Sequence, residues 1–385
     1  MAHSEKQQIT IFPTNRCNMN CSYCVASKSI QELHSKEIDI DFAKAGIQDY
    51  FSQGHHQIRF YSNGEPTCGM DVIKECVKYG RELIEKRKKR DVHAKSLITE
   101  IQTNCFFDEV TAVWIGENID YVWASIDGWP DVQDKYRRPK SNKGSSEKVL
   151  KNIEIIRDIK EKEQKKTGKD TFIGVRSTIV NETVDRQEEL VEYFAKIGIK
   201  EICSEPCFRP VDYPQENNQK ITLVDLGKYV QNFISAWKRA QELEVSYINS
   251  FIVNFGNDKG VNTKYACRAC LPTPHLTVDG CVSACDLAFH AKTSLPHLIY
   301  GKWDFETKQI QYDNQAIEKL RDRHCNKISK CNGCIIQTHC CGGCLGRAYH
   351  ETGDFYGVIK EYCDATRYLY EHLDLGKVKF LHLHP

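Results

Sequence analysis

Three cysteines near the start of the sequence have a spacing suited to metal–sulfur chemistry. They stand in Cys17-Asn18-Met19-Asn20-Cys21-Ser22-Tyr23-Cys24, directly after the apolar run Ile9–Phe12, which favours a strand. The order C-x3-C-x2-C places three thiolates on one loop at the end of that strand. Thiolates are the ligands of iron–sulfur clusters, and three of them can hold three corners of a cubane. The fourth iron then stays open to a small molecule.

A second group of cysteines lies in the C-terminal third. It begins with Cys267-x2-Cys270, continues with Gly280-x4-Cys285, and includes the run Cys331-x2-Cys334-x5-Cys340-x3-Cys344 and then Cys363. Pairs of the form C-x2-C commonly hold structural zinc. A zinc-stabilised binding module without catalysis is therefore the rival hypothesis from another class of protein, but zinc does not account for the N-terminal triad.

The triad and its surroundings resemble the radical S-adenosylmethionine (radical SAM) superfamily, whose members carry such a triad after the first strand of a partial (β/α)6 barrel. The resemblance implies that Cys17, Cys21 and Cys24 bind a [4Fe-4S] cluster. Its open iron would be chelated by the amino and carboxylate groups of SAM. One electron then splits SAM into methionine and a 5'-deoxyadenosyl radical. Tyr23, just before the third cysteine, also fits the family pattern.

Two further segments resemble the SAM-binding turns of this family. Ser62–Pro66 resembles a Gly-Gly-Glu-Pro turn that meets the amino group of SAM, which makes candidates of Asn63, Gly64, Glu65 and Pro66. Asn63 replaces the first glycine, and asparagine tolerates a positive φ better than most residues. Gln102–Cys105 resembles the family's Thr-Asn-Gly, with Asn104 as a candidate contact. Cys105 replaces the glycine there, and we expect it either to be buried or to face the substrate.

Four residues at the ends of later strands complete the expected SAM site. By the resemblance, Ser125 and Asp127 lie near the ribose and the methionyl carboxylate, and Arg137 is a carboxylate or structural partner. The alternative for Arg137 is a solvated ion pair with an aspartate such as Asp134. Alternation along the fifth strand points Arg176 to the same side as the threonine two residues on. An arginine inside a barrel needs an anion, such as a carboxylate of SAM or of the substrate.

The second cysteine group resembles the SPASM extension of peptide- and protein-modifying radical SAM enzymes, which binds two auxiliary [4Fe-4S] clusters. The resemblance assigns Cys270, Cys285 and Cys344 to auxiliary cluster I, with Cys267 or Cys281 as the fourth ligand. It assigns to auxiliary cluster II the ligands Cys331, Cys334, Cys340 and Cys363.

Asp286 directly follows Cys285, as an aspartate does in sulfatase-maturating enzymes. The resemblance implies that Asp286 accepts a proton during oxidation of a substrate side chain. The alternative is that Asp286 caps a helix over Leu287–Ala291, because aspartate is a favoured N-cap residue.

The elements that must position these residues alternate in type along the chain. Six β-rich runs are interleaved with helical patterns, which predicts a parallel α/β sheet or barrel with its functional residues at the carboxyl ends of the strands. The expected strands are Gln8–Phe12, Gln57–Ser62, Leu97–Thr103, Tyr121–Ile126, Phe172–Val180 and Glu201–Ser204. The expected helices are 40–53, 70–89, 108–117, 145–165 and 183–197, with a further long helix over Leu223–Glu244.

Length and composition limit the remaining choices. A chain of 385 residues suggests two or three domains, and we expect a radical SAM core at 1–215, a helical bridge at 216–263 and a SPASM domain at 264–385. The net charge of +1 favours neither nucleic acid nor anionic lipid, and no apolar run is long enough for a membrane span. We expect a cytoplasmic protein whose 19 cysteines serve metals rather than disulfides.

The sequence therefore predicts a radical SAM/SPASM enzyme with SAM and three [4Fe-4S] clusters. The resemblance favours a peptide or protein side chain as the substrate, which would be oxidised or cross-linked. The alternative is oxidation of a small molecule such as a sugar alcohol or a tetrapyrrole side chain. The chemistry needs an external one-electron reductant such as flavodoxin or ferredoxin. Because the triad begins at residue 17, we expect either a separate leader-peptide-binding protein or a substrate without a leader.

Overall fold

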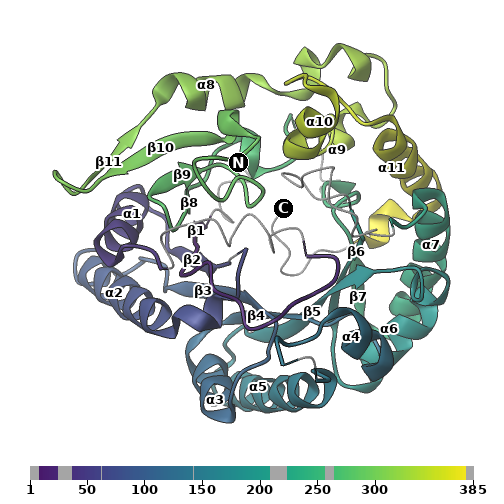
Figure 1. The fold of residues 1–385 in the computed structure, drawn as a ribbon, viewed down its shortest axis with the longest axis horizontal. Coiled ribbons are helices and arrows are strands. Elements are labelled where there is room, and N and C mark those ends of the chain that lie inside the picture. Colours follow the sequence, from purple (N-terminus) through teal and green to yellow (C-terminus); the bar gives the residue numbers. More distant parts are fainter. Residues whose placement is uncertain are drawn as a thin grey trace.

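The computed structural model describes residues 8–24, 37–61, 63–141, 143–208, 223–255 and 264–378. Within these residues one sheet of eleven strands curves through the molecule in the order β11-β10-β9-β8-β1-β2-β3-β4-β5-β6-β7 (Figure 1). Its two edge strands do not pair with each other, so the sheet is an open barrel wall. The predicted α/β partial barrel is confirmed.

Seven parallel strands and β8 form the centre of this wall. The parallel strands are β1 (Ile9–Ile11), β2 (Gln57–Phe60), β3 (Ile98–Thr103), β4 (Tyr121–Ser125), β5 (Phe172–Ile179), β6 (Glu201–Pro206) and β7 (Ser246–Ile248). Each of these strands pairs in parallel with its neighbour, as when Ile9 and Ile11 of β1 face Ile58 and Phe60 of β2. All three residues of β1 and all four of β2 are buried, because the barrel interior and the outer helices cover both faces of a parallel sheet.

Helices cover the outside of the parallel strands (Figure 1). They are α1 (Ile40–Ser52), α2 (Met70–Lys88), α3 (Glu109–Asn118), α4 (Pro130–Tyr136), α5 (Ser146–Thr167), α6 (Gln187–Lys196) and α7 (Leu226–Glu242). Aspartates begin several of them: Asp39, Asp108 and Asp225 each accept a hydrogen bond from a backbone N–H of the first turn. This side-chain acceptor satisfies a donor that the helix leaves free. The six expected strands and six expected helices are confirmed to within a few residues, although Ser62 lies outside the described residues.

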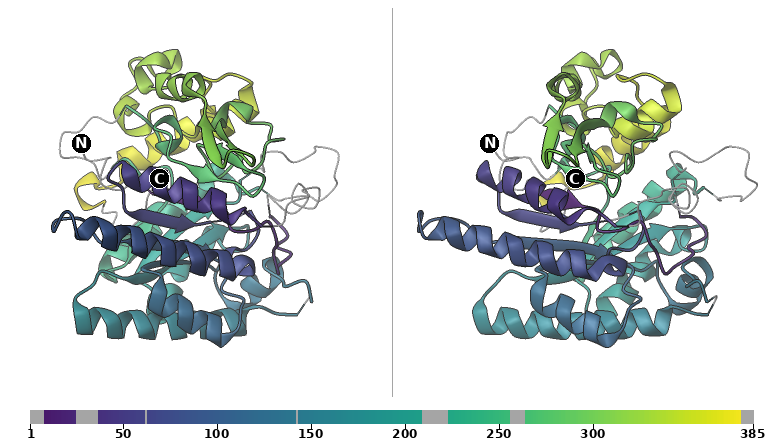
Figure 2. Two further views of the ribbon diagram at one scale, coloured as in Figure 1. Left: turned by 90° about the vertical axis from the view of Figure 1, so that its left-hand side faces the viewer. Right: turned by 60° about the vertical axis from the view of Figure 1, so that its left-hand side comes forward.

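The cysteine-rich C-terminal part extends the same sheet. Its strands are β8 (His275–Leu276), β9 (Cys281–Ser283), β10 (Ile299–Asp304) and β11 (Gln309–Tyr312). β8 pairs in parallel with β1, and the other three follow in antiparallel order. Figure 2 shows this part, in green and yellow, stacked on the N-terminal strands and helices.

Four further helices occupy the open side of the wall. They are α8 (Asn314–Asp322), α9 (Gln337–Cys340), α10 (Leu345–Thr352) and α11 (Lys360–His372). α11 packs against α7, so helices complete the ring that the sheet leaves open (Figure 1). The predicted domain boundary at 215/216 lies outside the described residues, and the one at 263/264 lies at the edge of another undescribed segment. The three-part division stays a prediction.

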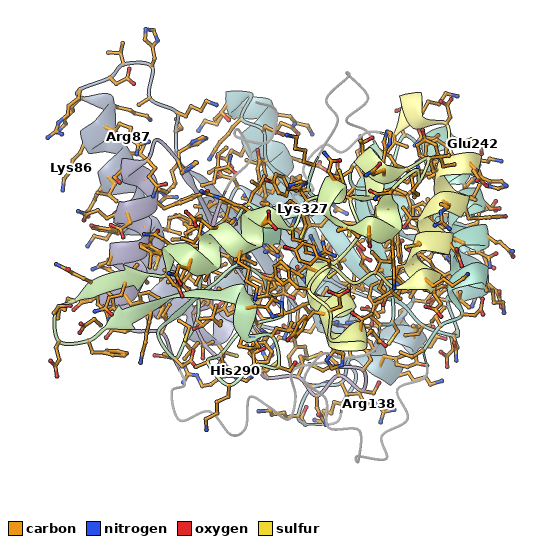
Figure 3. The ribbon with its side chains drawn as sticks, turned by 90° about the horizontal axis from the view of Figure 1, so that it is seen from above. Lys86, Arg87, Arg138, Glu242, His290 and Lys327 are labelled. Carbon is orange, nitrogen blue, oxygen red and sulfur yellow. The ribbon has the colours of Figure 1, made fainter. Side chains whose placement is uncertain are left out.

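Charged side chains cover the outer surface, as Figure 3 shows for Lys86 and Arg87 near the end of α2. Lys86 is exposed, but Arg87 donates a 2.9 Å hydrogen bond to the carbonyl of His55 and therefore ties α2 to the start of β2. None of the helices in the described ranges is both long and apolar enough to span a membrane.

Candidate functional site

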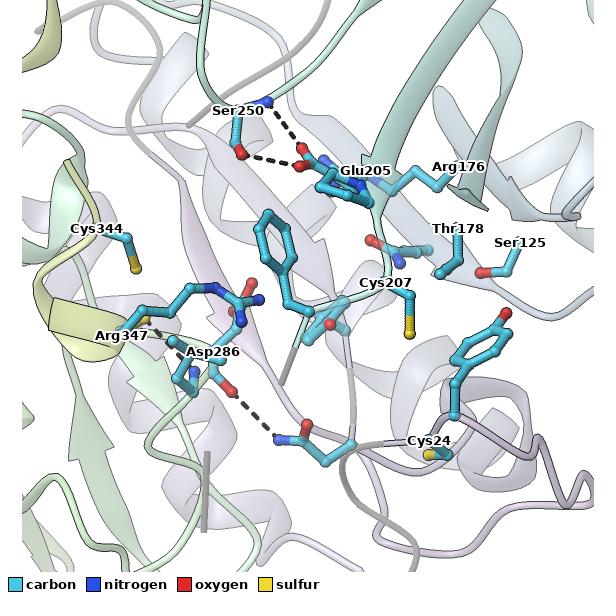
Figure 4. A pocket seen from close by; sticks show the side chains of 18 of the residues that line it. Cys24, Ser125, Arg176, Thr178, Glu205, Cys207, Ser250, Asp286, Cys344 and Arg347 are labelled. Atoms are coloured by element: carbon cyan, nitrogen blue, oxygen red, sulfur yellow. Dashed lines mark hydrogen bonds between the residues drawn. The ribbon is translucent and has the colours of Figure 1, made fainter. Parts of the chain in front are cut away.

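A cavity of about 1250 Å³ lies inside the ring, between the carboxyl ends of the parallel strands and the cysteine-rich part. Figure 4 shows Cys24, Ser125 and Thr178 on one side of it and Cys344, Arg347 and Asp286 on the other. Cys207 lies between the two sides (Figure 4). The cavity thus joins residues that are far apart in the sequence.

The N-terminal cysteine triad lines this cavity. Burial, together with the charges of neighbouring cysteines of the triad, raises the pKa of Cys17 to about 12 and that of Cys21 to about 11. The three thiols therefore lie within electrostatic reach of one another. The backbone N–H of Met19 donates to the Cys17 sulfur over 3.4 Å, a bond that favours the thiolate.

No three His, Cys, Asp or Glu side chains in the described part of the chain converge on a point where one metal ion would sit. Each thiolate of a [4Fe-4S] cluster binds a different iron, so such a cluster does not require that convergence. The grouping of the triad fits a cluster better than a single ion.

Two hydrogen-bonded loops hold the triad in place. The side chain of Asn104 donates to the side-chain carbonyl of Asn18 over 2.8 Å, and Asn18 donates to the carbonyl of Phe106 over 2.7 Å. On the other side, a Cβ added to Gly64 would stand 2.3 Å from the carbonyl oxygen of Arg16. Only glycine therefore fits this turn against the cysteine loop.

Glu65 is buried beneath the cavity with its carboxylate largely occupied. Oε1 accepts from the N–H and hydroxyl of Thr67 and from the hydroxyl of Thr103, at 2.6–3.1 Å. Oε2 accepts one bond, from the N–H of Asn104 at 2.7 Å. Burial raises the pKa of Glu65 despite these donors. Oε2 is the oxygen with capacity left for a ligand in the cavity.

Tyr23, Asp127 and Arg137 form one buried network. The Tyr23 hydroxyl donates to Asp127 and accepts a 2.7 Å hydrogen bond from Arg137. Asp127 is 0% exposed, also accepts from the N–H of Thr178, and does not line the cavity. Asp127 is thus placed behind Tyr23, which does line it. The solvated pair of Arg137 with Asp134 is wrong, because the Asp134 carboxylate instead accepts hydrogen bonds at the start of α5.

Orphaned polar atoms around the cavity fit a polar ligand such as SAM. Gln102 Oε1, Arg137 Nε and Arg176 Nε are buried and find no partner among the described residues, and all three side chains line the cavity. Ser125 and Thr178 line it too, and Arg176 and Thr178 share the predicted side of β5. Buried polar atoms normally have partners, so these two donors and one acceptor indicate a ligand with complementary groups.

Two substitutions in the expected SAM turns have specific structural outcomes. The side chain of Asn63 donates to the backbone carbonyl of Asp286 over 3.3 Å, whereas the tolerance of a positive φ at this position stays a prediction. Cys105 adopts a φ of 55° and is fully buried in the core, not in the cavity wall.

Four cysteines of the C-terminal part form a first tetrad: Cys267, Cys270, Cys285 and Cys344. The charges of Cys344 and Cys267 act on Cys285, and those of Cys270 and Cys344 act on Cys267. The charges that act on Cys281 are those of Asp279 and Lys302. Cys267 also lines the cavity with Cys285 and Cys344, whereas Cys281 does not, but the choice of the fourth ligand stays a prediction. The N–H of Leu287 donates to the Cys285 sulfur over 3.5 Å.

A second tetrad consists of Cys331, Cys334, Cys340 and Cys363. Burial raises the pKa of Cys340 to about 12, and Cys363, Cys331 and Cys334 add to that rise. Cys340 and Cys363 line the same cavity, as do the first-tetrad residues Cys267, Cys285 and Cys344. The second tetrad holds the four cysteines expected at auxiliary cluster II, and the first holds three expected at auxiliary cluster I with one of the two candidates for the fourth ligand; both assignments stay predictions.

Asp286 enters the cavity wall from the turn after Cys285. Its carboxylate pairs with Arg59 at 3.0 Å and with Nε2 of His275 at 3.1 Å. Burial opposes its ionisation, but the charge of Arg59 and the hydrogen bond of His275 hold the pKa of Asp286 well below its usual range. The helix over Leu287–Ala291 does not form, because these residues are in turns and bends, so the capping alternative is wrong.

Sequence reasoning missed Arg59, His275, Arg323 and Arg347. Arg59 could have been found from the sequence, because it places a charge in the middle of the short strand β2. Only a buried partner could stabilise a charge at that position. His275 belongs to a strand of two residues, which is too short to leave a periodic pattern.

Residues 11–176 match the family model of the radical SAM superfamily. This part of the chain is therefore a radical SAM domain, which implies binding of SAM and of a [4Fe-4S] cluster. A cysteine-type anaerobic sulfatase-maturating enzyme from Clostridium novyi is 22% identical over 346 residues, covering 86% of this chain and 85% of the relative. The protein is a radical SAM enzyme related to sulfatase-maturating enzymes.

Solved structures share the whole fold. Native anSMEcpe with bound AdoMet has a TM-score of 0.72 at 17% identity, covering 95% of this chain and 96% of that one. SuiB of Streptococcus suis bound to S-adenosylmethionine has a TM-score of 0.63 at 13% identity, covering 94% of this chain and 77% of that one. Other structures of these two proteins contain a Cp18Cys peptide and the precursor peptide SuiA.

Proposed function

We propose that this enzyme oxidises or cross-links a side chain of a peptide or protein, with two auxiliary [4Fe-4S] clusters at the two tetrads. A [4Fe-4S] cluster with SAM supplies a 5'-deoxyadenosyl radical, which removes a hydrogen atom from an unactivated carbon. The observation that carries the proposal is the shared cavity. The triad Cys17, Cys21 and Cys24 lines one side, and Cys285 and Cys344 line the other. A side chain inserted between them can lose a hydrogen atom on one side and an electron on the other.

The size of the cavity supports a substrate in addition to SAM. Its volume of about 1250 Å³ exceeds the roughly 300–1,000 Å³ of pockets that hold one drug-sized ligand. The related structures with a Cp18Cys peptide and with SuiA support a peptide as that substrate.

An aromatic wall offers the substrate an apolar contact surface. Phe208, Phe251 and Tyr362 all line the cavity, with ring centroids 5.6–6.1 Å apart. The guanidinium of Arg347 stacks 3.9 Å above the Phe208 ring. Flat apolar rings with one cation beside them bind a peptide segment through burial and orient it through charge.

Asp286 is the proposed proton acceptor. It is ionised, because Arg59 and His275 hold its pKa low, and it lines the cavity next to Cys285. A hydrogen atom, an electron and a proton together make up the two hydrogens that the substrate loses on oxidation. The ion pair with Arg59 also lowers the basicity of Asp286. Asp286 can therefore accept a strongly acidic proton, such as one on the heteroatom of a substrate radical.

Two partners belong to the proposal. An external one-electron reductant of the flavodoxin or ferredoxin class supplies the electron that splits SAM. The peptide is presented either by a separate leader-peptide-binding protein or directly.

The experiment is anaerobic reconstitution followed by metal and product analysis. The proposal expects about 12 iron atoms per chain, since three cubanes contain four each. It also expects 5'-deoxyadenosine, and loss of two hydrogens or a cross-link in a peptide substrate by mass spectrometry. Replacing Cys17, Cys21 and Cys24 together by Ala should abolish SAM cleavage and leave the iron of the two tetrads.

A matched control is Cys76→Ala, since Cys76 is fully buried in α2 and outside all three cysteine groups. It should keep both iron and SAM cleavage. Release of 5'-deoxyadenosine by the triple variant would refute the assignment of the triad. If the enzyme turns over a small sugar alcohol but no peptide, the substrate is a small molecule and the proposed substrate class is refuted.

A further inference from the structure

Arg323 is a fully buried charged residue in the cysteine-rich part. It follows α8 directly and is 1% exposed. Nε, Nη1 and Nη2 donate, over 2.9–3.4 Å, to the backbone carbonyls of Gly342, Gly343, Phe355 and Gly357. Each of its three nitrogens therefore has at least one backbone acceptor.

The glycines that Arg323 holds lie between the tetrads. Gly342 and Gly343 follow Cys340 of the second tetrad and precede Cys344 of the first. Cys341, Gly342 and Gly343 have φ values of 50°, 79° and 66°, a left-handed run that glycine adopts most readily. Arg323 therefore fixes the short link through which the backbone passes from one tetrad to the other.

The positive charge of Arg323 has no carboxylate partner. Carbonyl oxygens satisfy its N–H groups but carry no net charge, and no Asp or Glu in the described ranges forms an ion pair with it. A buried charge without a counter-charge is strongly unfavourable, and arginine does not lose its proton in proteins. The surroundings must therefore supply negative charge.

Cysteine thiolates on both sides can supply that charge. Gly343, whose carbonyl accepts from Arg323, adjoins Cys344 of the first tetrad, and Gly342, which also accepts from Arg323, lies two residues after Cys340 of the second. Four thiolates around a cluster leave an excess of negative charge, and a nearby cation stabilises this charge further when the cluster gains an electron.

We propose that Arg323 is a positioning residue shared by the two auxiliary sites: it supplies their common counter-charge, fixes the link between them, and raises the reduction potential of the cluster at the first tetrad. This inference rests on the proposed auxiliary clusters. A fixed positive charge beside a cluster favours the reduced state. The cluster at the first tetrad thereby becomes a better acceptor for an electron from the substrate.

The experiment compares Arg323→Gln with Arg323→Lys in the reconstituted enzyme. Iron content and EPR-monitored redox titration are measured, in addition to SAM cleavage at the distant triad. Arg323→Gln should make the first-tetrad cluster harder to reduce, with about a tenfold lower ratio of reduced to oxidised cluster at a given potential, which is about 59 mV for one electron. Arg323→Lys keeps the charge and should retain a potential near that of the wild type.

Arg367→Gln is the matched control. Arg367 lies in α11 four residues after Cys363 of the second tetrad, but its side chain is 40% exposed and pairs with Asp364. Water screens this charge, so the control should leave the first-tetrad potential unchanged.

Each result decides the inference. Wild-type iron and potentials in Arg323→Gln would overturn it. Loss of tetrad iron from Arg323→Gln supports it if Arg323→Lys keeps that iron, and overturns it if both variants lose the iron alike. If Arg323→Gln also loses SAM cleavage, the variant has failed to fold and Arg323→Lys alone decides. Wild-type potentials in Arg323→Lys then support the inference, and shifted potentials or missing iron in this variant overturn it. Zinc at the tetrads of the wild-type protein would refute the proposed clusters themselves, before any variant is made.

Discussion

The side-chain amide of Asn63 donates a 3.3 Å hydrogen bond to the backbone carbonyl of Asp286. Asn63 opens the turn that continues into Gly64 and Glu65 on the SAM side, whereas Asp286 follows Cys285 of the first tetrad. The residue that replaces a family glycine thus connects the two sides of the cavity. The ion pair between Arg59 and Asp286 runs beside this bond and makes the same connection.

Asn63→Ala should loosen this connection. A single hydrogen bond contributes about 0.5–1.5 kcal/mol, so we expect a loss of about 1 kcal/mol in the free energy of unfolding and up to about tenfold weaker SAM binding. Denaturant unfolding and equilibrium binding measure the two effects. Asn232→Ala is the control, because Asn232 makes its side-chain bonds on the surface of α7. Equal effects of the two variants would show that the bond to Asp286 has no special role.

Glu65→Ala should lower both stability and SAM affinity. It leaves the N–H of Asn104 and the hydroxyl of Thr103 without their buried acceptor, at about 1–3 kcal/mol for each group. Loss of a charge-assisted bond to the amino group of SAM would weaken binding roughly 10- to 150-fold. Glu82→Ala, on the exposed face of α2, should change neither. A folded, iron-loaded Glu65→Ala variant with unchanged SAM affinity would remove Glu65 from the binding site.

Asp286→Asn should keep SAM cleavage and lose substrate oxidation. Asparagine preserves the shape of the side chain but cannot take a proton at neutral pH. The variant also removes one carboxylate from buried Arg59, so its stability should fall as well. Product analysis by mass spectrometry is compared with 5'-deoxyadenosine release in the same reaction.

Glu100→Gln separates the two effects of Asp286→Asn. Glu100 lies 3.3 Å from Nε of Arg59, whereas Asp286 pairs with Nη1, and Glu100 does not line the cavity. It should lower stability to a similar degree and leave product formation intact. A wild-type product yield from Asp286→Asn would show that Asp286 serves only to pair with Arg59. Loss of product in both variants would show that the effect comes from disturbing Arg59.

His56 should make the protein less stable in mild acid. Burial first, and then the charges of Lys95 and Arg87, lower the pKa of His56 from 6.5 to about 4. The unfolded chain therefore binds a proton at His56 between these values that the folded chain does not, and stability falls as pH drops from about 6.5 to about 4. The loss is at most about 3 kcal/mol for this group.

Denaturant unfolding at pH 7 and pH 5 measures this dependence. His56→Gln should flatten it, because glutamine does not titrate. His93→Gln is the control, since His93 is exposed in the loop after α2 and should leave the slope unchanged. An unchanged slope in His56→Gln would contradict the prediction.

The sequence predicts the parallel strands β1 to β6 well because each is a short apolar run followed by an amphipathic helix, as with Phe172–Ile179 and then Gln187–Lys196, but it does not predict β7. It does not predict β8, which has two residues and depends on pairing with β1. Tertiary contact alone stabilises such a strand.

The resemblance to a family predicts a grouping of the cysteines, whereas the polar network around them could not be predicted. Spacing indicates which thiols are candidates, but the partner of Asp286 is Arg59, from a distant strand. Asp127 illustrates the same limit: its position after β4 is as expected, yet Tyr23 stands between it and the cavity. Side-chain direction at a strand end depends on packing that no local pattern records.

The pairing of β8 with β1 has a consequence for biosynthesis. β1 is made first, at residues 9–11, but the neighbour on its outer side lies at residues 275–276. At ~5–20 residues per second, a ribosome leaves that edge of the sheet unpaired for on the order of tens of seconds. An open edge is prone to pair with other chains. During the same interval the cysteine-rich part that lies across the cavity from the triad has not yet been made. The nascent protein is then both at greatest risk of aggregation and most accessible to the machinery that delivers iron and sulfide.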